Sequence, residues 1–528
     1  MGKGFQKTVY ILLAFFIGLF IASSFVYRAQ YNFFAYGDTP VLERQHFGVF
    51  VFVIVFVSLG SIALYRICLK LNKYSRKVVI PATLLCSFLI QLLIIFLFTR
   101  VPTDDSQTVL SLAWGMLYDN DYSTFQTEGY LHMFPYNFSI VLYLKTLLLL
   151  FPDNYLVIKI FNILFTLVTT LMIYLIYKAL NTKSDEHDYG VLVFAATYIP
   201  SLFMNNLIYN DVIGTAFLTI AIYFSIQFIK GKALKHLVLA AVLLAIGNYF
   251  RSVGIIVLIA VAISILLSIK SIGVKKGITA LVILVLLFNV PNWTQNTLLL
   301  KHNVVKESVN QNSAPVYMWL NMGINLDTFG FWDNRESYTI YQEQAKYNKA
   351  VSTELYKKEI SRKVSEATWG ELATMYYKKI IWTWTEGTYQ MDRYGIGNDG
   401  SLGGGQQRMG GIAGSYSYST VASDLFEGDS NYRKSLLWIV YVLNILMYGL
   451  ILVRLIGGIR AKRFDEVSLI LVILGFIGFY ILWEIKSRYI YPVYPLLIVL
   501  SYMGFKDVHD HFIQRILPRY QSSQGEEL

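Results

Sequence analysis

The sequence is poor in cysteine and in charge. Only two cysteines, Cys68 and Cys86, occur among 528 residues, so neither a disulfide framework nor a zinc cluster built on cysteines is expected. Charged residues make up 15% of the chain against 55% hydrophobic residues, and the mean hydropathy is +0.48. This balance excludes an ordinary soluble enzyme and predicts a membrane protein.

Apolar runs long enough to cross a bilayer recur along nearly the whole chain. A helix needs about 20 residues to cross a hydrocarbon core of roughly 30 Å, and these runs lack the strict alternation of barrel strands. We therefore predict an all-α polytopic membrane protein with about twelve transmembrane helices. The predicted spans are 8–27, 47–66, 79–98, 154–179, 189–206, 212–229, 236–250, 253–270, 277–297, 435–456, 466–485 and 490–505.

Lysine and arginine gather in every second connection between these runs. They precede the first run, follow the second, fourth, sixth, eighth and tenth, and recur in the tail. Basic residues near span ends favour the cytoplasmic side, so both termini are predicted to be cytoplasmic in a multi-pass protein of the plasma membrane. The formal net charge of +11 is explained by these loops and by membrane lipid, so no nucleic-acid partner is needed.

The apolar stretch 136–151 is not counted as a span. It is short, contains Lys145 and lies between Pro135 and Pro152, which suits a helix along the membrane interface. Counting it as a span would place later basic connections on the wrong side of the membrane. The outer loop 99–135 is therefore predicted to face outwards.

Three regions follow from this topology. Residues 1–300 form an N-terminal transmembrane region that carries the outer loop 99–135 and the interfacial helix 136–151. Residues 301–432 form an extracytoplasmic insert far longer than a usual connection, which predicts a functional unit. Residues 433–528 hold the last transmembrane helices and a cytoplasmic tail.

The insert is predicted to fold as a small helical unit. Helix-forming composition marks 353–366 and 369–381. The glycine-rich stretch 395–414 then predicts either a flexible lid that handles the acceptor or a mere tether.

Two adjacent aspartates, Asp104 and Asp105, follow the apolar run 79–98 by a few residues. Neighbouring carboxylates repel each other unless a cation or a substrate hydroxyl shares the site, so the pair is predicted to be a catalytic base or a metal site. Asp104 is preferred as the base, whereas Asp105 is equally suited to cap a helix that begins near Gln107. A divalent cation that bridges Asp104 and Asp211 stays an open alternative, although no ligand spacing demands a metal.

Further polar groups interrupt the apolar pattern where predicted spans end on the outer side. They are Asn210 and Asp211 after the fifth span, Arg251 after the seventh, and Glu484, Lys486, Arg488 and Tyr489 after the eleventh. Charges at such depth are functional candidates, and cations there suit a phosphate at headgroup depth. The alternative is a set of anchoring side chains that snorkel to water.

Outward carboxylates and outward cations together fit group transfer from a lipid phosphate. Asp104 would deprotonate an acceptor hydroxyl, and cations would offset the charge that builds on the departing phosphate. The predicted donor phosphate site consists of Arg251, Lys486, Arg488 and Tyr489.

The chain also resembles a known family, the GT-C glycosyltransferases, in particular bacterial relatives of dolichyl-phosphate-mannose protein mannosyltransferase (glycosyltransferase family 39) and of lipid A aminoarabinose transferase. The motifs that carry the resemblance are Thr103-Asp104-Asp105, residues 129–137, Asn210-Asp211 and residues 483–489. It implies a GT-C-like bundle, a catalytic acid at Asp104 or Asp105, and a polyprenyl-phosphate sugar as donor. The supporting polar residues are His132, Asn137, Asn210, Asp211 and Glu484.

Two departures from the family pattern matter. Two additional spans precede the aspartate loop, and the family's His-Pro pair is split into His132 and Pro135, which leaves the role of His132 open.

We therefore expect an inverting membrane glycosyltransferase of a bacterial plasma membrane, with an extracytoplasmic active site and an undecaprenyl-phosphate monosaccharide as donor. The acceptor is expected to be an envelope glycan or protein, with teichoic acid, polysaccharide and protein hydroxyls not distinguished. A lipid-linked sugar flippase, with Asp211, Arg251 and Glu484 along its pathway, is one alternative, and a polysaccharide polymerase or ligase is another. No internal repeat is found, and the ionisable groups gather at one face, which favours the enzyme.

Overall fold

The computed structural model describes residues 2–34, 37–152, 154–181, 187–333, 335–396 and 418–524. Seven helices in these ranges are long and apolar enough to cross a membrane, or eight if the bent pair Ser123–Met133 and Pro135–Leu150 is one span. The polytopic membrane class is therefore confirmed. The seven are α1 (Gly2–Ser24), α2 (Phe47–Leu71), α3 (Arg76–Leu97), α7 (Tyr155–Leu180), α10 (Asn210–Gly231), the pair α14 (Val274–Phe288) with α15 (Val290–Lys301), and α22 (Asn431–Ala461).

The expected number of about twelve full spans is only partly met. Three apolar helices of the described residues are shorter than a usual span: α11 (Leu234–Phe250), α12 (Gly254–Leu267) and α23 (Val467–Leu482). The predicted span 490–505 falls in η8 (Ser487–Val493) and in the first part of α24 (Tyr494–Gln524).

The predicted span 189–206 is broken. It consists of α8 (Gly190–Ala196), α9 (Ile199–Phe203) and the single turn η4 (Met204–Asn206). Pro200 lies in the first turn of α9; it has no N–H to donate to the Ala196 carbonyl and its ring would clash with that carbonyl, so α8 ends at Ala196 and does not continue into α9. The sequence predicted one continuous span because most residues of this stretch are apolar.

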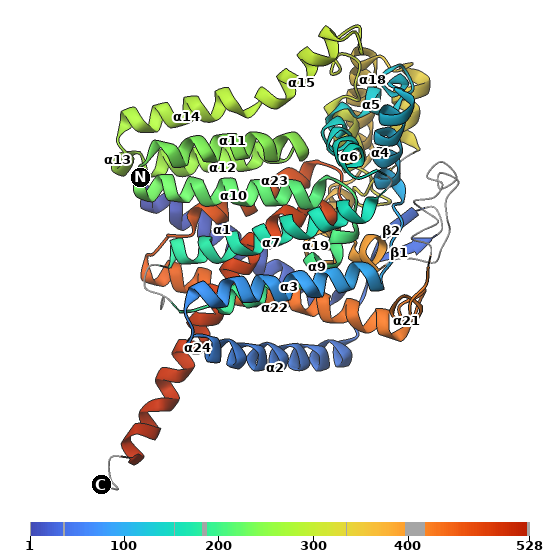
Figure 1. Cartoon of the computed structure of the whole chain (residues 1–528). Helices are drawn as coiled ribbons and strands as arrows, with labels where there is room; N and C mark the ends of the chain where they lie inside the picture. Colours follow the sequence, from blue (N-terminus) through green and yellow to red (C-terminus); the bar gives the residue numbers. More distant parts are fainter. Residues whose placement is uncertain are drawn as a thin grey trace.

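The apolar helices lie side by side, and short helices cover one end of their bundle (Figure 1). That end holds α4 (Asp104–Trp114), α6 (Phe138–Leu150) and α18 (Lys349–Glu366), whereas both termini and α13 (Ile269–Ile272) lie at the opposite end. Helix α6 packs against α4 and extends across the ends of the spans. It is bent by 104° against the preceding helical segment Ser123–Met133, and its position along the membrane interface stays a prediction.

Helix α10 lies in the middle of the bundle. It packs against α7, α11, α12 and η8. In its apolar stretch of 18 residues 67% is buried, against 17% in the corresponding stretch of α2. Asn210 and Asp211, at the start of α10, are accordingly 3% and 0% exposed and lie at the covered end.

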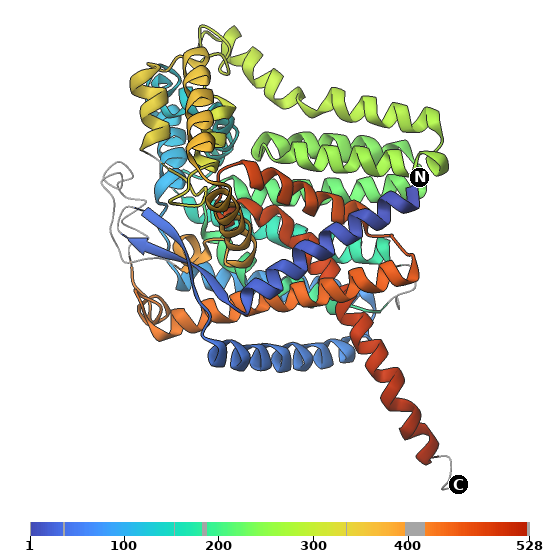
Figure 2. The same ribbon diagram turned by 180° about the vertical axis from the view of Figure 1, so that it is seen from behind.

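The sequence pattern did not predict the β-hairpin between α1 and α2. Strands β1 (Tyr27–Phe34) and β2 (Gly37–Arg44) pair antiparallel, with Tyr27 opposite Arg44. Ala29 and Tyr31 of β1 are buried, and the Tyr31 ring packs edge-on against Trp382 with centroids 4.7 Å apart. Figure 2 shows the hairpin at the covered end of the bundle.

The insert is helical, as predicted. Its helices are α16 (Val316–Gly323), α17 (Glu336–Thr339), α18 (Lys349–Glu366), α19 (Trp369–Thr385) and α21 (Val421–Leu425). Met318, Met322, Tyr341 and Tyr356 form a small core with Met133 of the outer loop. Helix α19 leaves this core and packs against α1, α22 and α23. The predicted glycine-rich loop lies outside the described residues from position 397 onwards.

Candidate active site

A cavity of about 770 Å³ lies at the covered end of the bundle. Its walls come from the start of α4, the turn before α6, the starts of α10 and α12, the insert and the end of α23. The charged residues that line it are Asp38, Asp104, Asp105, Arg251, Lys349, Arg393, Glu484, Lys486 and Arg488. Acidic and basic side chains from segments far apart in the sequence thus line the same cavity.

The two aspartates begin α4. The helix starts at Asp104, three residues before the predicted position, and its N-cap is Thr103, whose backbone N–H donates a 3.1 Å hydrogen bond to the Ser106 hydroxyl. The expectation that Asp105 caps a helix beginning near Gln107 is therefore wrong. Both carboxylates are left to face the cavity.

The backbone of Asp104 is strained. Its φ is 55°, in the left-handed region that aspartate tolerates better than most residues but that still costs energy. Such strain gathers at functional sites, where surrounding contacts hold it.

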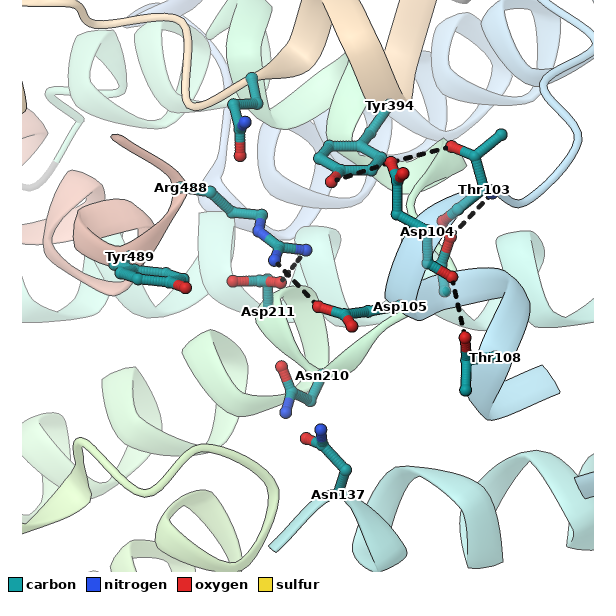
Figure 3. Close-up of polar contacts among 12 residues, drawn as sticks. Thr103, Asp104, Asp105, Thr108, Asn137, Asn210, Asp211, Tyr394, Arg488 and Tyr489 are labelled. Carbon is teal, nitrogen blue, oxygen red and sulfur yellow. Dashed lines mark hydrogen bonds and ion pairs between the residues drawn. The ribbon is translucent and has the colours of Figure 1, made fainter. Parts of the chain in front are cut away.

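Arg393 holds the Asp104 carboxylate. Its Nε and Nη2 donate hydrogen bonds of 2.9 and 3.0 Å to Oδ2 and Oδ1, and Tyr394 OH lies 3.5 Å from Oδ2 (Figure 3). Burial raises the pKa of Asp104, but the hydrogen bonds and the charge of Arg393 outweigh burial, so its pKa lies below the usual value. The carboxylate is thus kept ionised while 40% of the side chain stays exposed.

Asp105 belongs to a different set of contacts. Tyr130 OH donates a 3.3 Å hydrogen bond to Asp105 Oδ1, and Asn137 Nδ2 donates a 2.7 Å bond to the Tyr130 oxygen. On the other side, Asp105 Oδ2 lies 3.9 Å from Nη2 of Arg488. Asn137 therefore supports the site through Tyr130.

Two arginines share the buried carboxylate of Asp211. Arg251 Nη2 lies 3.1 Å from Asp211 Oδ1. Figure 3 shows the second contact, in which Arg488 Nη1 lies 3.7 Å from Asp211 Oδ2. Arg251 Nη1 also donates a 3.2 Å hydrogen bond to Asn210. A Cβ added at Gly214 would lie 2.8 Å from the Cβ of Arg251, so this glycine makes room for the arginine. The two guanidinium groups thus share Asp211, and Arg488 also lies 3.9 Å from Asp105.

The guanidinium of Arg488 is buried but poorly paired. Among the described residues its ion pairs, at 3.7 and 3.9 Å, exceed hydrogen-bond distance, and the rings of Tyr209 and Tyr394 lie 5.0 and 5.1 Å away. Burying N–H donors without acceptors is costly, and Arg488 lines the cavity. Its donors are therefore available to an anion there.

The turn after α23 carries the remaining predicted residues. Tyr489 OH donates a 2.8 Å hydrogen bond to Glu484 Oε1, and Lys486 Nζ lies 4.7 Å from the centre of the Trp332 ring. Burial, only partly offset by the charge of Lys486, raises the pKa of Glu484 to about 7. Ile485 N donates a 2.9 Å bond to Gly330 O, which fixes this turn to the insert.

His132 is not brought to the cavity. Its ring contacts that of Tyr347, with centroids 6.2 Å apart, and His132 is not among the residues that line the cavity. Burial lowers its pKa. The structure thus separates His132 from the other predicted site residues.

Arg393 and Asp38 are site residues that the sequence pattern did not reveal, and Tyr130 lies in the motif 129–137 but was not named as a site residue. Arg393 lies directly before the glycine-rich stretch, in the π-helical turn η6 (Asp392–Ile396), and the charged pair Asp392-Arg393 in that otherwise weakly charged stretch was the available signal. Asp38 is on strand β2, where the Gln390 side chain donates a hydrogen bond to it.

The alternative of a divalent cation bridging Asp104 and Asp211 does not fit these residues. In the described part of the chain no three His, Cys, Asp or Glu residues form a group able to hold a metal ion. Asp104 is paired with Arg393, and Asp211 with Arg251 and Arg488. Each carboxylate already faces a guanidinium, so a shared cation would have to displace these arginines.

Carboxylates and arginines therefore meet in a cavity at one end of an apolar helical bundle, which defines a polytopic membrane protein with a polar site suited to an anionic lipid headgroup. Residues 139–294 match the family model of the dolichyl-phosphate-mannose-protein mannosyltransferases. The resemblance to this mannosyltransferase family is confirmed over this segment, which contains Asn210, Asp211 and Arg251. No curated protein shows significant similarity to the chain.

Proposed function

We propose that this protein transfers a monosaccharide from a polyprenyl phosphate, of the undecaprenyl type, to a hydroxyl group of an extracytoplasmic envelope acceptor, with inversion at the anomeric carbon. The observation that carries the proposal is the meeting of Asp104 and Asp105 with Arg251 and Arg488 around one cavity. The family match over residues 139–294 supports the donor class.

The donor phosphate is assigned to Arg488 and Arg251. Charge-assisted hydrogen bonds from guanidinium groups are the strongest that proteins offer to phosphate. Val253, Ile255 and Phe479 line the same cavity, and Ile255 is exposed on the surface of the bundle. An anionic headgroup at the arginines would therefore leave its polyprenyl chain beside an apolar surface that lipid can reach.

Asp104 is assigned as the base. The acceptor oxygen attacks the anomeric carbon and transfers its proton to Asp104, while the bond from that carbon to the phosphate oxygen breaks with its electron pair staying on the phosphate. Arg488 and Arg251 offset the charge that develops there, as other preorganised cations do. Asp105, 3.9 Å from Arg488, is assigned to positioning this arginine.

The acceptor is assigned to the opposite face of the membrane from the termini. The basic connections Arg66 to Lys77 and Lys270 to Lys276 lie at the end of the bundle opposite the covered end. Basic loops favour the cytoplasm. The cavity would then open outside the cell, where the insert can meet a teichoic acid, polysaccharide or protein.

The test is transfer from a synthetic polyprenyl-phosphate sugar by the purified protein. Asp104→Asn should lower kcat by about 10²–10⁴-fold, whereas Asp119→Asn, at an exposed position of the same loop, should leave it unchanged. Equal rates for Asp104→Asn and the wild type would remove Asp104 as the base. Absence of any donor turnover by the wild type, with donor movement across vesicles instead, would favour a flippase.

A further inference from the structure

Aromatic side chains form one wall of the cavity beside the Arg488 turn. Trp319 and Trp332 of the insert, Tyr338 of α17 and Trp483 after α23 line it. The Trp319 and Trp483 rings stack with centroids 5.5 Å apart and an angle of 10° between their planes, and the Trp332 and Tyr338 rings meet edge to face at 6.2 Å. We refer to these four residues as the aromatic wall.

The rings of the aromatic wall are only partly buried. Part of each side chain therefore remains open on the cavity side, beside the stacked Trp319–Trp483 pair and the contact between Lys486 and Trp332, and a ligand in the cavity can cover it. The C–H groups on one side of a pyranose ring pack well on aromatic rings, because the ring faces carry partial negative charge. The aromatic wall thus has the chemistry of a surface that holds a sugar.

Glu484 lies next to the aromatic wall with half of its hydrogen-bonding capacity unused. The residue is 3% exposed; its Oε1 accepts from Tyr489, but Oε2 has no hydrogen-bond partner among the described residues. A buried carboxyl oxygen without a donor is costly. Glu484 also lines the cavity, so a ligand hydroxyl there could supply the missing donor.

The position of Glu484 is fixed from both sides. Ile485 pairs with Phe331 in a β-bridge, and the backbone bond from Ile485 to Gly330 ties the turn to the insert segment that carries Trp332. Tyr489 connects Glu484 to the phosphate arginines, since Arg251 lies 5.5 Å above the Tyr489 ring. The carboxyl group and the aromatic wall are therefore held as one unit.

The sugar of a lipid-phosphate donor is bonded directly to the phosphate. If the phosphate lies at Arg488 and Arg251, the pyranose ring must lie within one ring length of it. Glu484 accepts a 2.8 Å hydrogen bond from the hydroxyl of Tyr489, and Arg251 lies 5.5 Å from the centre of that ring. The aromatic wall and Glu484 are thus within reach of a donor sugar whose phosphate is held by the arginines.

We propose that Glu484 and the aromatic wall form the subsite that selects the donor sugar: the pyranose ring lies on Trp332 and Trp319, and one ring hydroxyl donates a hydrogen bond to Glu484 Oε2. This inference rests on the proposed function. It predicts preference for a neutral pyranose that carries this hydroxyl and rejection of the corresponding deoxy sugar. A site built to bind a hydroxyl discriminates strongly against an analogue that lacks it.

The experiment compares farnesyl phosphate with farnesyl phosphate linked to glucose, mannose or N-acetylglucosamine, using calorimetric titration of the purified full chain in detergent. In the wild type the preferred glycoside should bind at least about 10-fold more tightly than farnesyl phosphate itself. Glu484→Ala should abolish this advantage, while its affinity for farnesyl phosphate stays within about threefold. Trp332→Leu should also reduce the advantage, and Glu427→Ala, at an exposed site on another segment, should retain it.

Deoxy donors make the test specific for one hydrogen bond. Each ring hydroxyl of the preferred glycoside is removed in turn. One of these deoxy forms should bind to the wild type as weakly as the full glycoside binds to Glu484→Ala. The affinity of that deoxy form should be the same for Glu484→Ala as for the wild type. Retention of the full sugar advantage by Glu484→Ala would overturn the subsite. Failure of the wild type to bind either farnesyl phosphate or its glycosides would overturn the proposed function itself, and the two failures are therefore distinguishable.

Discussion

Arg393 donates two parallel hydrogen bonds, of 2.9 and 3.0 Å, to the two carboxylate oxygens of Asp104. The arginine comes from η6, within the insert, and the aspartate comes from the start of α4, in the first outer loop. A two-point contact of this kind fixes the plane of the carboxylate as well as its position. The insert thus contributes directly to the orientation of the proposed base.

Loss of the two hydrogen bonds from Arg393 to Asp104 should lower kcat more than it lowers donor affinity. In Arg393→Lys the charge is kept but the planar pair of donors is lost, so we expect kcat to fall by about 10-fold or more with little change in donor Kd. Steady-state kinetics and donor titration of the same preparation measure both. A parallel loss of donor affinity would show that Arg393 binds donor instead of orienting Asp104.

The pH dependence of transfer should report the same contact. A base must be ionised, so activity is present above its pKa and is lost as the pH falls through it. Because Arg393 holds the pKa of Asp104 below its usual value, wild-type kcat/KM should show no acid limb down to pH of about 4. In Arg393→Gln the pKa of Asp104 should rise, so the loss of kcat/KM on the acid side should begin at a higher pH than in the wild type. An identical profile in the two proteins would contradict the assignment.

Arg488 should be tested with a substitution that keeps its charge. Arg488 and Asp211 are both almost fully buried, and truncation to alanine would leave the Asp211 carboxylate with Arg251 alone, which threatens folding. Arg488→Lys should weaken donor binding by about 10–100-fold, because charge-assisted hydrogen bonds to phosphate contribute about 1.5–3 kcal/mol. Donor titration checks the affinity, and a thermal melt confirms that the variant is folded. Unchanged affinity would place the phosphate elsewhere.

The sequence predicted the elements that depend on local composition. The long apolar helices, the helix that ends at Leu150 and the insert helices ending at Glu366 and Thr385 follow from apolar length and helix propensity. The helix start at Asp104 was misplaced by three residues because Thr103 and Ser106 form the cap and Asp104 adopts a left-handed conformation. Neither feature has a pattern longer than a few residues.

Contacts between distant segments were beyond sequence reasoning. The pairing of Asp104 with Arg393 spans 289 positions, and nothing local to Arg393 identifies its partner. The hairpin was missed because its inward residues, Ala29 and Tyr31, are few and directly follow a long apolar helix. By contrast, the nearness of Asp105, Asp211 and Arg488 was anticipated, because each is a charge at the same end of an apolar helix.

Substitution of His132 offers a contrast with the cavity residues. Its ring lies against Tyr347, away from the cavity lining, so His132→Ala should change kcat and donor Kd by less than about twofold while costing about 1 kcal/mol of stability. Transfer kinetics and a thermal melt separate the two effects. A large loss of kcat in a folded His132→Ala protein would mean that the histidine reaches the acceptor in the working enzyme.

The orientation of the cavity can be tested by cysteine labelling in intact cells. The two native cysteines, of which Cys68 is buried and Cys86 is exposed, are first replaced by serine. Gln126 in the outer loop and Lys275 after α13 are both exposed and lie on segments at opposite ends of the bundle. If basic loops are cytoplasmic, a membrane-impermeant maleimide should label Gln126→Cys in intact cells and Lys275→Cys only after lysis. The reverse pattern would place Asp104 and the arginines on the cytoplasmic face and would exclude an envelope acceptor, whereas the contacts within the cavity would stand.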